Sequence, residues 1–357
     1  MAKDTKAGRK IPAGRAAPNN PDNRYHAWRR EAVDDGWTPQ DMPPLRTTLD
    51  LDRSRTAITR NDSPDIPFDR SINPYRGCEH GCIYCYARPT HAWLDLSPGL
   101  DFESRLFQRP DLPRQLRREL SAHGYRPQTL CIGSVTDAYQ PVERRTGLTR
   151  RILEVLVETR HPVSIITKSA LVERDIDLLT DLAADGLVEV AVSITTLVTD
   201  LVRRLEPRAA APLRRLQTLE RLSAAGIPTR IAVAPVIPAL TEPELETLLG
   251  AGREAGAADA SYTLLRLPLE VAPLFQAWLE QTAPDAAGHV MSRVRASRGG
   301  RANDSRFGRR MVGQGVYADL LAQRFRVAVR RLGFPGIPPL REEHFRPPPR
   351  NGQLTLF

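Results

Sequence analysis

The stretch NPYRGCEHGCIYCYARPTHAWL, residues 73–94, contains three of the four cysteines of the chain. Cys78, Cys82 and Cys85 follow the spacing CxxxCxxC, just after a β-prone run at 72–76. A loop of this length can place three thiolates around one face of an iron–sulfur cluster. A [4Fe–4S] cluster has four irons, so three cysteine ligands leave one iron open to a ligand from outside the protein. The spacing therefore predicts a cluster site with an open iron.

Zinc is the alternative metal for these cysteines. A zinc site is expected to have a fourth protein ligand, which His80 or His91 could supply. A histidine in such a position is more often solvated or hydrogen-bonded than bound to metal. Clustered thiols do not resemble a secreted disulfide framework, and in a reducing compartment they usually indicate a metal.

Composition limits the class of protein. With 357 residues, 41% of them hydrophobic, the chain can bury the core of one large domain or two modest ones. No run of about 18 apolar residues predicts a membrane span, and residues 1–24 lack the apolar segment of a secretory signal. We therefore expect a cytoplasmic protein without membrane contact. The net charge of +9 would attract polyanions, although charge alone does not establish a nucleic-acid partner.

Strand-like and helical patterns alternate from about residue 64 to residue 266. Because parallel strands need crossover connections, this alternation predicts an α/β fold with a parallel sheet and helices outside it. Six strands suit an open, partial (β/α)6 barrel better than a closed barrel of eight strands. In barrels, functional residues gather at the carboxyl ends of the strands. The expected strands are 72–76, 129–135, 163–167, 188–194, 230–236 and 260–265.

Composition also divides the chain into four segments. Residues 1–45 are rich in Pro, Arg, Lys and Asn, which predicts a disordered basic arm. Residues 46–269 form the expected barrel, and 270–335 a helical C-terminal extension that is interrupted by the basic stretch RVRASRGGRANDSRFGRRM at 293–311. Residues 336–357 are expected to be a Pro-rich, disordered tail.

The CxxxCxxC motif, with the aromatic Tyr84 directly before the third cysteine, resembles the signature of the radical S-adenosylmethionine superfamily. This resemblance implies that S-adenosylmethionine binds the open iron through its amino and carboxylate groups. An electron from an external donor, passed through the reduced cluster, would then cleave it to methionine and a 5′-deoxyadenosyl radical. The radical abstracts hydrogen from a substrate, while the protein positions the reactants and excludes water.

Roughly residues 70–240 further resemble the spore photoproduct lyase branch of this superfamily. The segment Cys82 to Tyr86 resembles its C-x-Y-C-Y, and GSVTD at 133–137 resembles its segment ending in Ser/Thr-Asp. Other matching residues follow in the same order: Thr167-Lys168, SIT at 193–195, Glu206-Pro207, Pro212, Arg215 and Ala234-Pro235.

This resemblance implies a set of cofactor-binding residues. Lys168 would offer cationic donors to a carboxylate and Ser193 a hydroxyl, although each is also an ordinary residue for a strand end. Thr136 and Asp137 could approach the cofactor, but an Asp in this position is often the N-cap of the next helix. Glu206 and Arg208 would line the site or form a local ion pair, and Arg215 is expected to be structural or on the surface.

The resemblance fails at the residue that returns hydrogen. The lyase uses a cysteine near the end of its second strand, where this chain has Ser134. Cys131 lies three residues earlier, on the opposite face of the strand, and is expected to be a buried structural cysteine. This difference argues against thymine-dimer lysis by the same mechanism. An aromatic residue, Tyr84, Tyr86 or Tyr139, could replace the cysteine, and the catalytic residue is not identified.

Two features suggest the substrate and a partner. The last residues, Gln353, Leu354, Leu356 and Phe357, resemble the pentapeptide that docks bacterial repair proteins on the sliding clamp, unless they dock on the protein's own surface. The arginines between Arg293 and Arg310 could contact phosphates or form a solvated loop. We therefore expect a radical enzyme that repairs or modifies nucleic acid, more specifically DNA. The alternatives are a tRNA, protein or metabolite substrate, or a non-catalytic iron–sulfur protein recruited to DNA.

Overall fold

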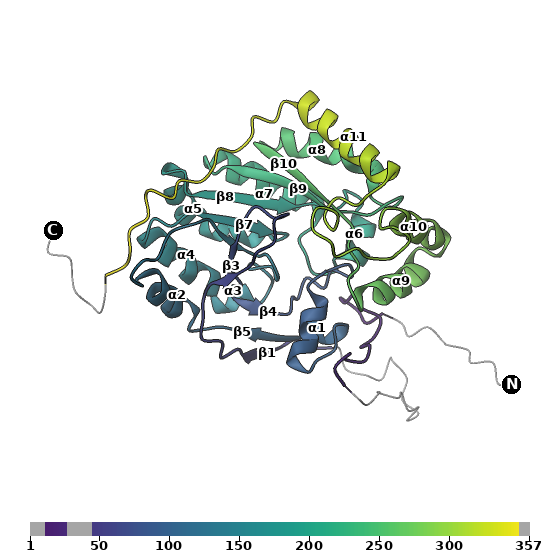
Figure 1. Ribbon diagram of the computed structural model, residues 1–357, viewed down its shortest axis with the longest axis horizontal. Coiled ribbons are helices and arrows are strands. Elements are labelled where there is room, and N and C mark those ends of the chain that lie inside the picture. Colours follow the sequence, from purple (N-terminus) through teal and green to yellow (C-terminus); the bar gives the residue numbers. More distant parts are fainter. Residues whose placement is uncertain (1–10, 27–44, 350–357) are drawn as a thin grey trace.

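The computed structural model describes residues 11–26 and 45–349. Its centre is a seven-stranded sheet with the order β10-β9-β8-β7-β6-β3-β2 (Figure 1). The strands from β3 to β10 in this sheet pair in parallel, and β2 pairs with β3 antiparallel. The six parallel strands of an open barrel are therefore confirmed. Their bounds are β3 Arg70–Ile72, β6 Leu130–Ile132, β7 Val163–Thr167, β8 Val188–Ser193, β9 Thr229–Val236 and β10 Asp259–Leu264, with β2 at Thr59–Arg60.

Two of the expected strands end earlier than the sequence pattern suggests. The run 72–76 is divided, because Pro74 lacks the N–H that a ladder needs. Its second half becomes β4 (Tyr75–Arg76), which joins β1 (Thr48–Leu51) and β5 (Arg105–Gln108) in a separate three-stranded sheet. β6 ends at Ile132 because Gly133 has a φ of 93°, and a Cβ there would lie 2.2 Å from the carbonyl oxygen of Ile166.

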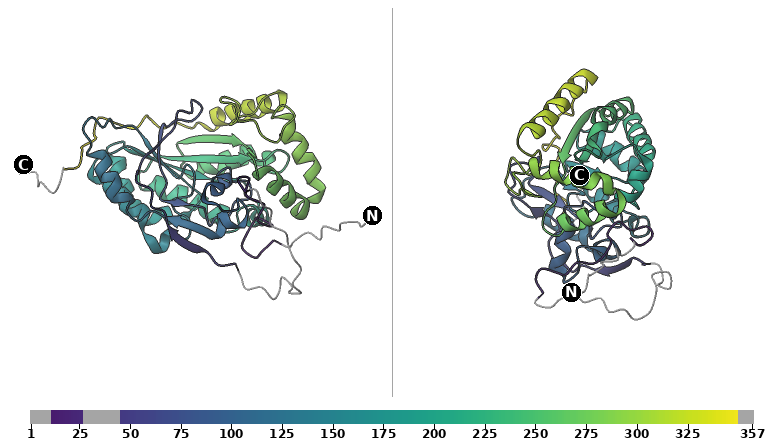
Figure 2. Two further views of the ribbon diagram at one scale, coloured as in Figure 1. Left: turned by 60° about the horizontal axis from the view of Figure 1, so that its bottom comes forward. Right: turned by 90° about the vertical axis from the view of Figure 1, so that its right-hand side faces the viewer.

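Amphipathic helices connect the parallel strands, and Figure 2 shows them gathered on the outer side of the sheet. In α4, for example, Ile152, Leu153 and Leu156 are buried, as expected for one face of a helix packed on a core. The crossover helices are α4 Leu148–Glu158, α5 Ile176–Ala184, α7 Pro212–Ala224 and α8 Leu245–Glu254. The shorter elements are η1 Arg88–Leu94, α1 Leu100–Ser104, α2 Leu112–Leu120, α3 Glu143–Thr146, η2 Ala170–Asp175, α6 Thr199–Leu205 and η3 Glu242–Glu244.

The chain after β10 is helical, with α9 (Val271–Thr282), α10 (Pro284–Ala296) and α11 (Val316–Leu332). From α11 the chain runs back along the amino ends of the strands (Figures 1 and 2). There the amides of Gly336, Arg341 and Arg346 donate to the carbonyls of Ala258, Gly186 and Thr159 at 2.8, 3.0 and 2.8 Å. None of the helices that the structure describes is long and apolar enough to cross a membrane.

Part of the segment that the sequence predicts to be disordered is packed in the structure. Ala16 and Ala17 are fully buried, and their amides donate to the carboxylate of Glu103 at 3.2 and 3.0 Å. A buried carboxylate needs hydrogen-bond donors. The bonds to Glu103 therefore explain why residues 11–26 pack against the domain. The rest of the basic arm, residues 1–10 and 27–44, lies outside the described residues, as do residues 350–357.

Candidate cofactor site

The three clustered cysteines lie on a loop, residues 77–87, that follows β4; we call it the cysteine loop. Cys78 and Cys82 are buried, Cys85 is partly exposed, and all three are free thiols. The Cys78 amide donates to Phe102 O at 2.9 Å, and the Cys85 amide donates to Cys82 O at 3.1 Å. Gly81 has a φ of 66°, and a Cβ there would lie 2.8 Å from Glu103, so only glycine fits this turn.

Arg88 fixes the backbone of the cysteine loop. Its guanidinium is fully buried and donates to Cys82 O at 2.9 Å, to Gly81 O at 3.0 Å and to Gly99 O at 2.9 Å. It also forms an ion pair of 2.5 Å with the buried carboxylate of Glu103. A side chain that uses several donors in this way leaves the loop with little freedom before any cofactor binds.

The donor set fits an iron–sulfur cluster. Burial raises the pKa of the Cys78, Cys82 and Cys85 thiols, so they are neutral until a metal removes their protons. No group of three His, Cys, Asp or Glu within 11–26 and 45–349 surrounds a single metal ion. The ligands of a cluster need not do so, because each cysteine binds a different iron atom.

Both histidines of the zinc alternative have other partners. His80 Nδ1 lies 3.2 Å from the carboxylate of Asp137. His91 is fully buried, and its Nε2 donates to Arg105 O at 2.9 Å. Burial lowers the pKa of His91 to about 4, so its ring is neutral at physiological pH.

Lys168 and Ser193 meet at the carboxyl ends of β7, β8 and β9. Lys168 Nζ donates to Ser193 Oγ at 2.5 Å and to Ala234 O at 3.1 Å, and Ser193 Oγ donates to Ala234 O at 2.9 Å. The ammonium also lies 5.9 Å from the ring centroid of Tyr84, the aromatic residue inside the cysteine motif. The structure therefore brings the two expected cofactor contacts together beside the cysteine loop.

Glu206 is the buried counter-ion of this region. It lies 3.7 Å from Lys168 Nζ, accepts from Thr195 Oγ1 at 2.7 Å, and pairs with the fully buried Arg215. Burial alone would raise the pKa of Glu206, but the charges of Arg215 and Lys168 and a hydrogen bond from Tyr84 lower it to about 2. Two cations thus share one carboxylate, which leaves positive charge at the site.

The other expected cofactor residues have protein partners. Thr136 Oγ1 donates to Tyr75 O at 3.0 Å, which turns the hydroxyl toward the backbone. Asp137 accepts from the Lys168 amide at 2.7 Å and from Thr167 Oγ1 at 2.8 Å, so it holds Lys168 in place. Burial opposes the charge of Asp137, but His80 and the hydrogen bond from the Lys168 amide lower its pKa overall. Arg208 forms the local ion pair, with Glu79 at 3.0 Å.

The residues considered for hydrogen return differ in accessibility. Cys131 is fully buried within β6, as the sequence predicts, and burial raises the pKa of its thiol to about 12. Tyr139 is also fully buried, and donates to Asp175 at 3.1 Å. Tyr84 is buried against Glu206, whereas Tyr86 is 47% exposed and donates to the backbone carbonyl of Ser134. Tyr86 is therefore the accessible phenol among the three.

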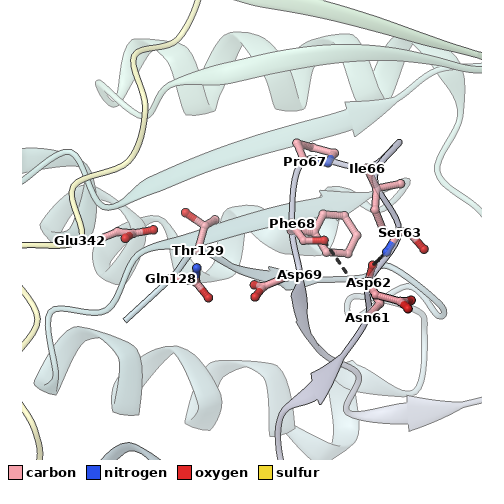
Figure 3. A pocket seen from close by; sticks show the side chains of 10 residues that line it. All are labelled: Asn61, Asp62, Ser63, Ile66, Pro67, Phe68, Asp69, Gln128, Thr129 and Glu342. Atoms are coloured by element: carbon pink, nitrogen blue, oxygen red, sulfur yellow. Dashed lines mark hydrogen bonds between the residues drawn. The ribbon is translucent and has the colours of Figure 1, made fainter. Parts of the chain in front are cut away.

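Sequence reasoning missed several residues of this region. Arg88 and Glu103 were not singled out, and neither was Arg266 at the end of β10, whose guanidinium carbon lies 5.1 Å from the ring centroid of Tyr86. The position of Arg88, three residues after the last cysteine of the motif, was a usable signal for it. A cavity of about 440 Å³ also opens beside residues 61–69 (Figure 3), and no residue of the cysteine loop is among its lining groups. Carboxylates of Asp62, Asp69 and Glu342 are among its lining groups.

Comparison with known proteins agrees with this geometry. The family model of the radical SAM superfamily matches residues 72–251. An uncharacterized protein of Mycobacterium tuberculosis (strain ATCC 25618 / H37Rv) is 37% identical over 222 residues, which cover 62% of this chain and 65% of that protein. An uncharacterized protein of Methanocaldococcus jannaschii is 31% identical over 215 residues, 60% of this chain and 76% of its own. The match thus spans less than two thirds of the mycobacterial relative.

Solved structures of spore photoproduct lyase share the fold. One of them, complexed with dinucleoside spore photoproduct, superposes with a TM-score of 0.57 at 17% identity, over 80% of this chain and 79% of the other. The chain belongs to the radical S-adenosylmethionine superfamily. Its fold is that of the spore photoproduct lyase branch. Membership implies a [4Fe–4S] cluster and S-adenosylmethionine as the cofactors, and the residues described above fit both.

Proposed function

We propose that this chain is a radical S-adenosylmethionine enzyme that repairs or modifies a nucleic acid, more specifically DNA. The radical chemistry is carried by one observation. Three free thiols on a fixed loop lie beside Lys168 and Ser193, at the carboxyl ends of the parallel strands. The nucleic-acid substrate is supported by the net charge of +9 and by the fold shared with a lyase that was solved with a dinucleoside photoproduct.

The residues of this chain have separate tasks in the proposed reaction. Cys78, Cys82 and Cys85 would hold the cluster, which together with S-adenosylmethionine supplies a radical that removes a hydrogen atom from the substrate. Lys168 would present its ammonium group, and Ser193 its hydroxyl, to the polar end of S-adenosylmethionine. Asp137, through the Lys168 amide, and Glu206, near its Nζ, orient this side chain.

The return of hydrogen distinguishes the proposed reaction from cysteine-dependent photoproduct lysis. Ser134 stands where the cysteine is expected, and Cys131 is fully buried. Tyr86 is accessible and hydrogen-bonded to Ser134, so it is the phenol best placed to take over this role. We therefore propose a reaction on nucleic acid that does not depend on a cysteine for this step.

The proposed partners follow from the same function. Residues 353–357, outside the described part of the chain, would bind the replicative sliding clamp through Gln353, Leu354, Leu356 and Phe357. An external electron donor would reduce the cluster, and the enzyme would act in the cytoplasm. Clamp pull-down that is lost in Leu356→Ala and Phe357→Ala supports DNA as the substrate, and unchanged pull-down contradicts this docking.

The function is tested by anaerobic incubation of reconstituted, dithionite-reduced protein with S-adenosylmethionine, with and without damaged duplex DNA. Chromatography follows 5′-deoxyadenosine and methionine. We expect cleavage that DNA stimulates. Cleavage that ignores DNA would retain the radical enzyme and direct the search to RNA, protein or metabolites. Absence of cleavage by protein with an intact cluster would contradict catalysis and favour a non-catalytic iron–sulfur protein recruited to DNA.

A further inference from the structure

The basic stretch after α10 forms a strap, residues 298–313, that is anchored to the end of β10. Arg298 is almost fully buried and donates to Leu264 O at 3.0 Å and to Leu265 O at 2.8 Å. The same guanidinium donates to Arg309 O and Arg310 O at 2.8 and 2.9 Å. The Leu264 amide completes the anchor by donating to Met311 O at 2.9 Å. One side of the strap is thereby fixed to the last strand of the sheet.

The other side of the strap is held by the carboxylate of Asp65. Asp65, on the loop between β2 and β3, accepts from Arg310 Nε at 2.8 Å and from the Gly308 amide at 3.3 Å. β10 and β2 are the opposite edges of the seven-stranded sheet. The strap therefore connects the two edges of the open barrel without strand pairing.

A second guanidinium lies beside this ion pair. Arg266 stacks on Tyr86, with 5.1 Å from its guanidinium carbon to the ring centroid, and its Nη1 contacts the Met311 sulfur at 3.3 Å. Its Nε is buried and has no hydrogen-bond partner in the part of the chain that the structure describes. Arg266 is within electrostatic range of both Arg310 and Asp65. Asp65 is thus paired with Arg310, whereas Arg266 forms no ion pair within residues 11–26 and 45–349.

We propose that Arg266 and Arg310 form a phosphate-binding subsite, and that a phosphodiester of the substrate displaces the carboxylate of Asp65 from Arg310. The ligand is the backbone of a polynucleotide, so this inference rests on the proposed nucleic-acid function. A guanidinium binds carboxylate and phosphate with the same two-pronged geometry, so the exchange needs no new arrangement of donors. The contact of Arg266 with Tyr86 places the bound phosphate next to the cysteine loop.

Asp65 has two functions in this proposal. Without substrate it neutralises part of the subsite and keeps the strap closed against the opposite edge of the sheet. When substrate arrives, Asp65 competes with the phosphate and lowers the affinity. Removing the Asp65 charge should therefore strengthen binding, whereas removing either guanidinium should weaken it. Opposite effects from two partners of one ion pair would not result from a purely structural pair.

The test measures binding of a fluorescein-labelled 20-nucleotide single strand of DNA to the reconstituted protein with S-adenosylmethionine, by anaerobic anisotropy across a salt series. We expect Arg266→Gln and Arg310→Gln each to weaken binding about tenfold and to reduce the slope of log K against log salt by about one. Asp65→Asn should strengthen binding at least threefold. A strand with methylphosphonate linkages should bind weakly and be insensitive to these substitutions.

Matched controls carry the same change of charge elsewhere. Asp62→Asn alters an exposed carboxylate on the same loop, and Arg114→Gln alters an exposed arginine, paired with Asp111, on α2. Equal effects of Asp65→Asn and Asp62→Asn, or of Arg310→Gln and Arg114→Gln, would overturn the subsite and leave the proposed function intact. Wild-type protein that binds no DNA or RNA strand would instead overturn the nucleic-acid substrate, and the subsite with it. Misfolding cannot explain the result expected for Asp65→Asn, because a gain of affinity requires folded protein.

Discussion

At the scale of single residues, the site combines incomplete charge compensation with fixed geometry. Lys168 and Arg215 share the carboxylate of Glu206, so the ammonium keeps part of its charge available to an anionic ligand. The partners of Lys168 come from the ends of neighbouring strands, Ser193 from β8 and Ala234 from β9. The ammonium is thus positioned before the ligand binds, and little entropy is lost on binding.

Lys168→Ala should weaken S-adenosylmethionine binding about tenfold or more, because a hydrogen bond to a charged group contributes about 1.5–3 kcal/mol. The cluster should remain, since Lys168 is not a ligand. Calorimetry on reconstituted protein measures the affinity, and iron analysis checks the cluster. Arg214→Ala, which removes a cation paired with Glu173 on the outer helices, is the control and should leave the affinity unchanged. Equal affinities of Lys168→Ala and wild type would return Lys168 to the role of an ordinary strand-end residue.

The four cysteines should separate into two classes. Cys82→Ala should abolish the [4Fe–4S] signal, because the remaining two thiols cannot hold the cluster in its three-ligand form. Cys131→Ala should retain it, since Cys131 lies fully buried within β6. Iron and sulfide analysis together with electron paramagnetic resonance distinguishes the two variants. Equal loss of iron in both would refute the ligand assignment.

At the scale of elements, the cysteine loop depends on contacts that it makes with the chain around it. Arg88, at the start of η1, holds the carbonyls of the loop, and Glu103 in α1 holds Arg88. Glu103 also accepts from the amides of Ala16 and Ala17, which brings residues 11–26 into the same network. The cysteine loop is therefore held by residues that precede it in the chain and by residues that follow it.

Arg88→Leu should lower the free energy of unfolding by about 3–5 kcal/mol, because it leaves the Glu103 carboxylate buried without its charge partner. We also expect less iron per chain, since the loop carbonyls lose their donors. Anaerobic urea unfolding measures the first effect. The comparison is Arg203→Ala, which breaks an exposed pair with Asp200 and should cost at most about 0.5 kcal/mol. A loss as small as in this control would show that the ion pair does not stabilise the loop.

At the scale of the whole molecule, the chain after α11 closes the side of the sheet opposite to the cofactor site. Phe345 packs on Tyr125 and His161, with ring centroids 5.4 Å from each. Nε2 of His161 accepts from the Tyr125 hydroxyl at 2.8 Å, and Nδ1 donates to Pro162 O at 3.0 Å. This use of both nitrogens requires a neutral ring, and burial lowers the pKa of His161 to about 4.

The depressed pKa predicts a loss of stability in acid. Unfolding releases a histidine with an ordinary pKa near 6.5, so the unfolded state binds the proton first and stability falls as the pH drops below that value. Between pH 7 and pH 5 this amounts to about 2 kcal/mol, at 1.36 kcal/mol per unit of pKa. Urea unfolding of His161→Gln should show a smaller decrease over this range than wild type, and the exposed His123→Gln should behave as wild type. The same pH dependence in all three proteins would contradict the prediction.

Sequence patterns predicted the features that depend on residues close to one another in the chain. The spacing of the cysteines and the position of Lys168 at a strand end could be predicted because each depends on a few neighbouring residues. The partner of Thr136 could not be predicted, because the orientation of its hydroxyl depends on Tyr75 in β4, 61 residues earlier in the chain. Asp65 and Arg310 are 245 residues apart in the sequence. They form a pair because the strap, anchored at β10, reaches the loop after β2, and this depends on the whole sheet.

The hydrogen bonds of residues 336–346 have a consequence for the synthesis of this protein. They occupy the carbonyls of Thr159, Gly186 and Ala258, which come just before β7, β8 and β10. All strands have left the ribosome well before residue 336 is made, so the nascent chain carries a sheet with unpaired carbonyls along one end. A ribosome stalled after β10 should therefore display a protease-sensitive sheet, and the ordered amino ends would form only after residues 336–346 have themselves left the ribosome.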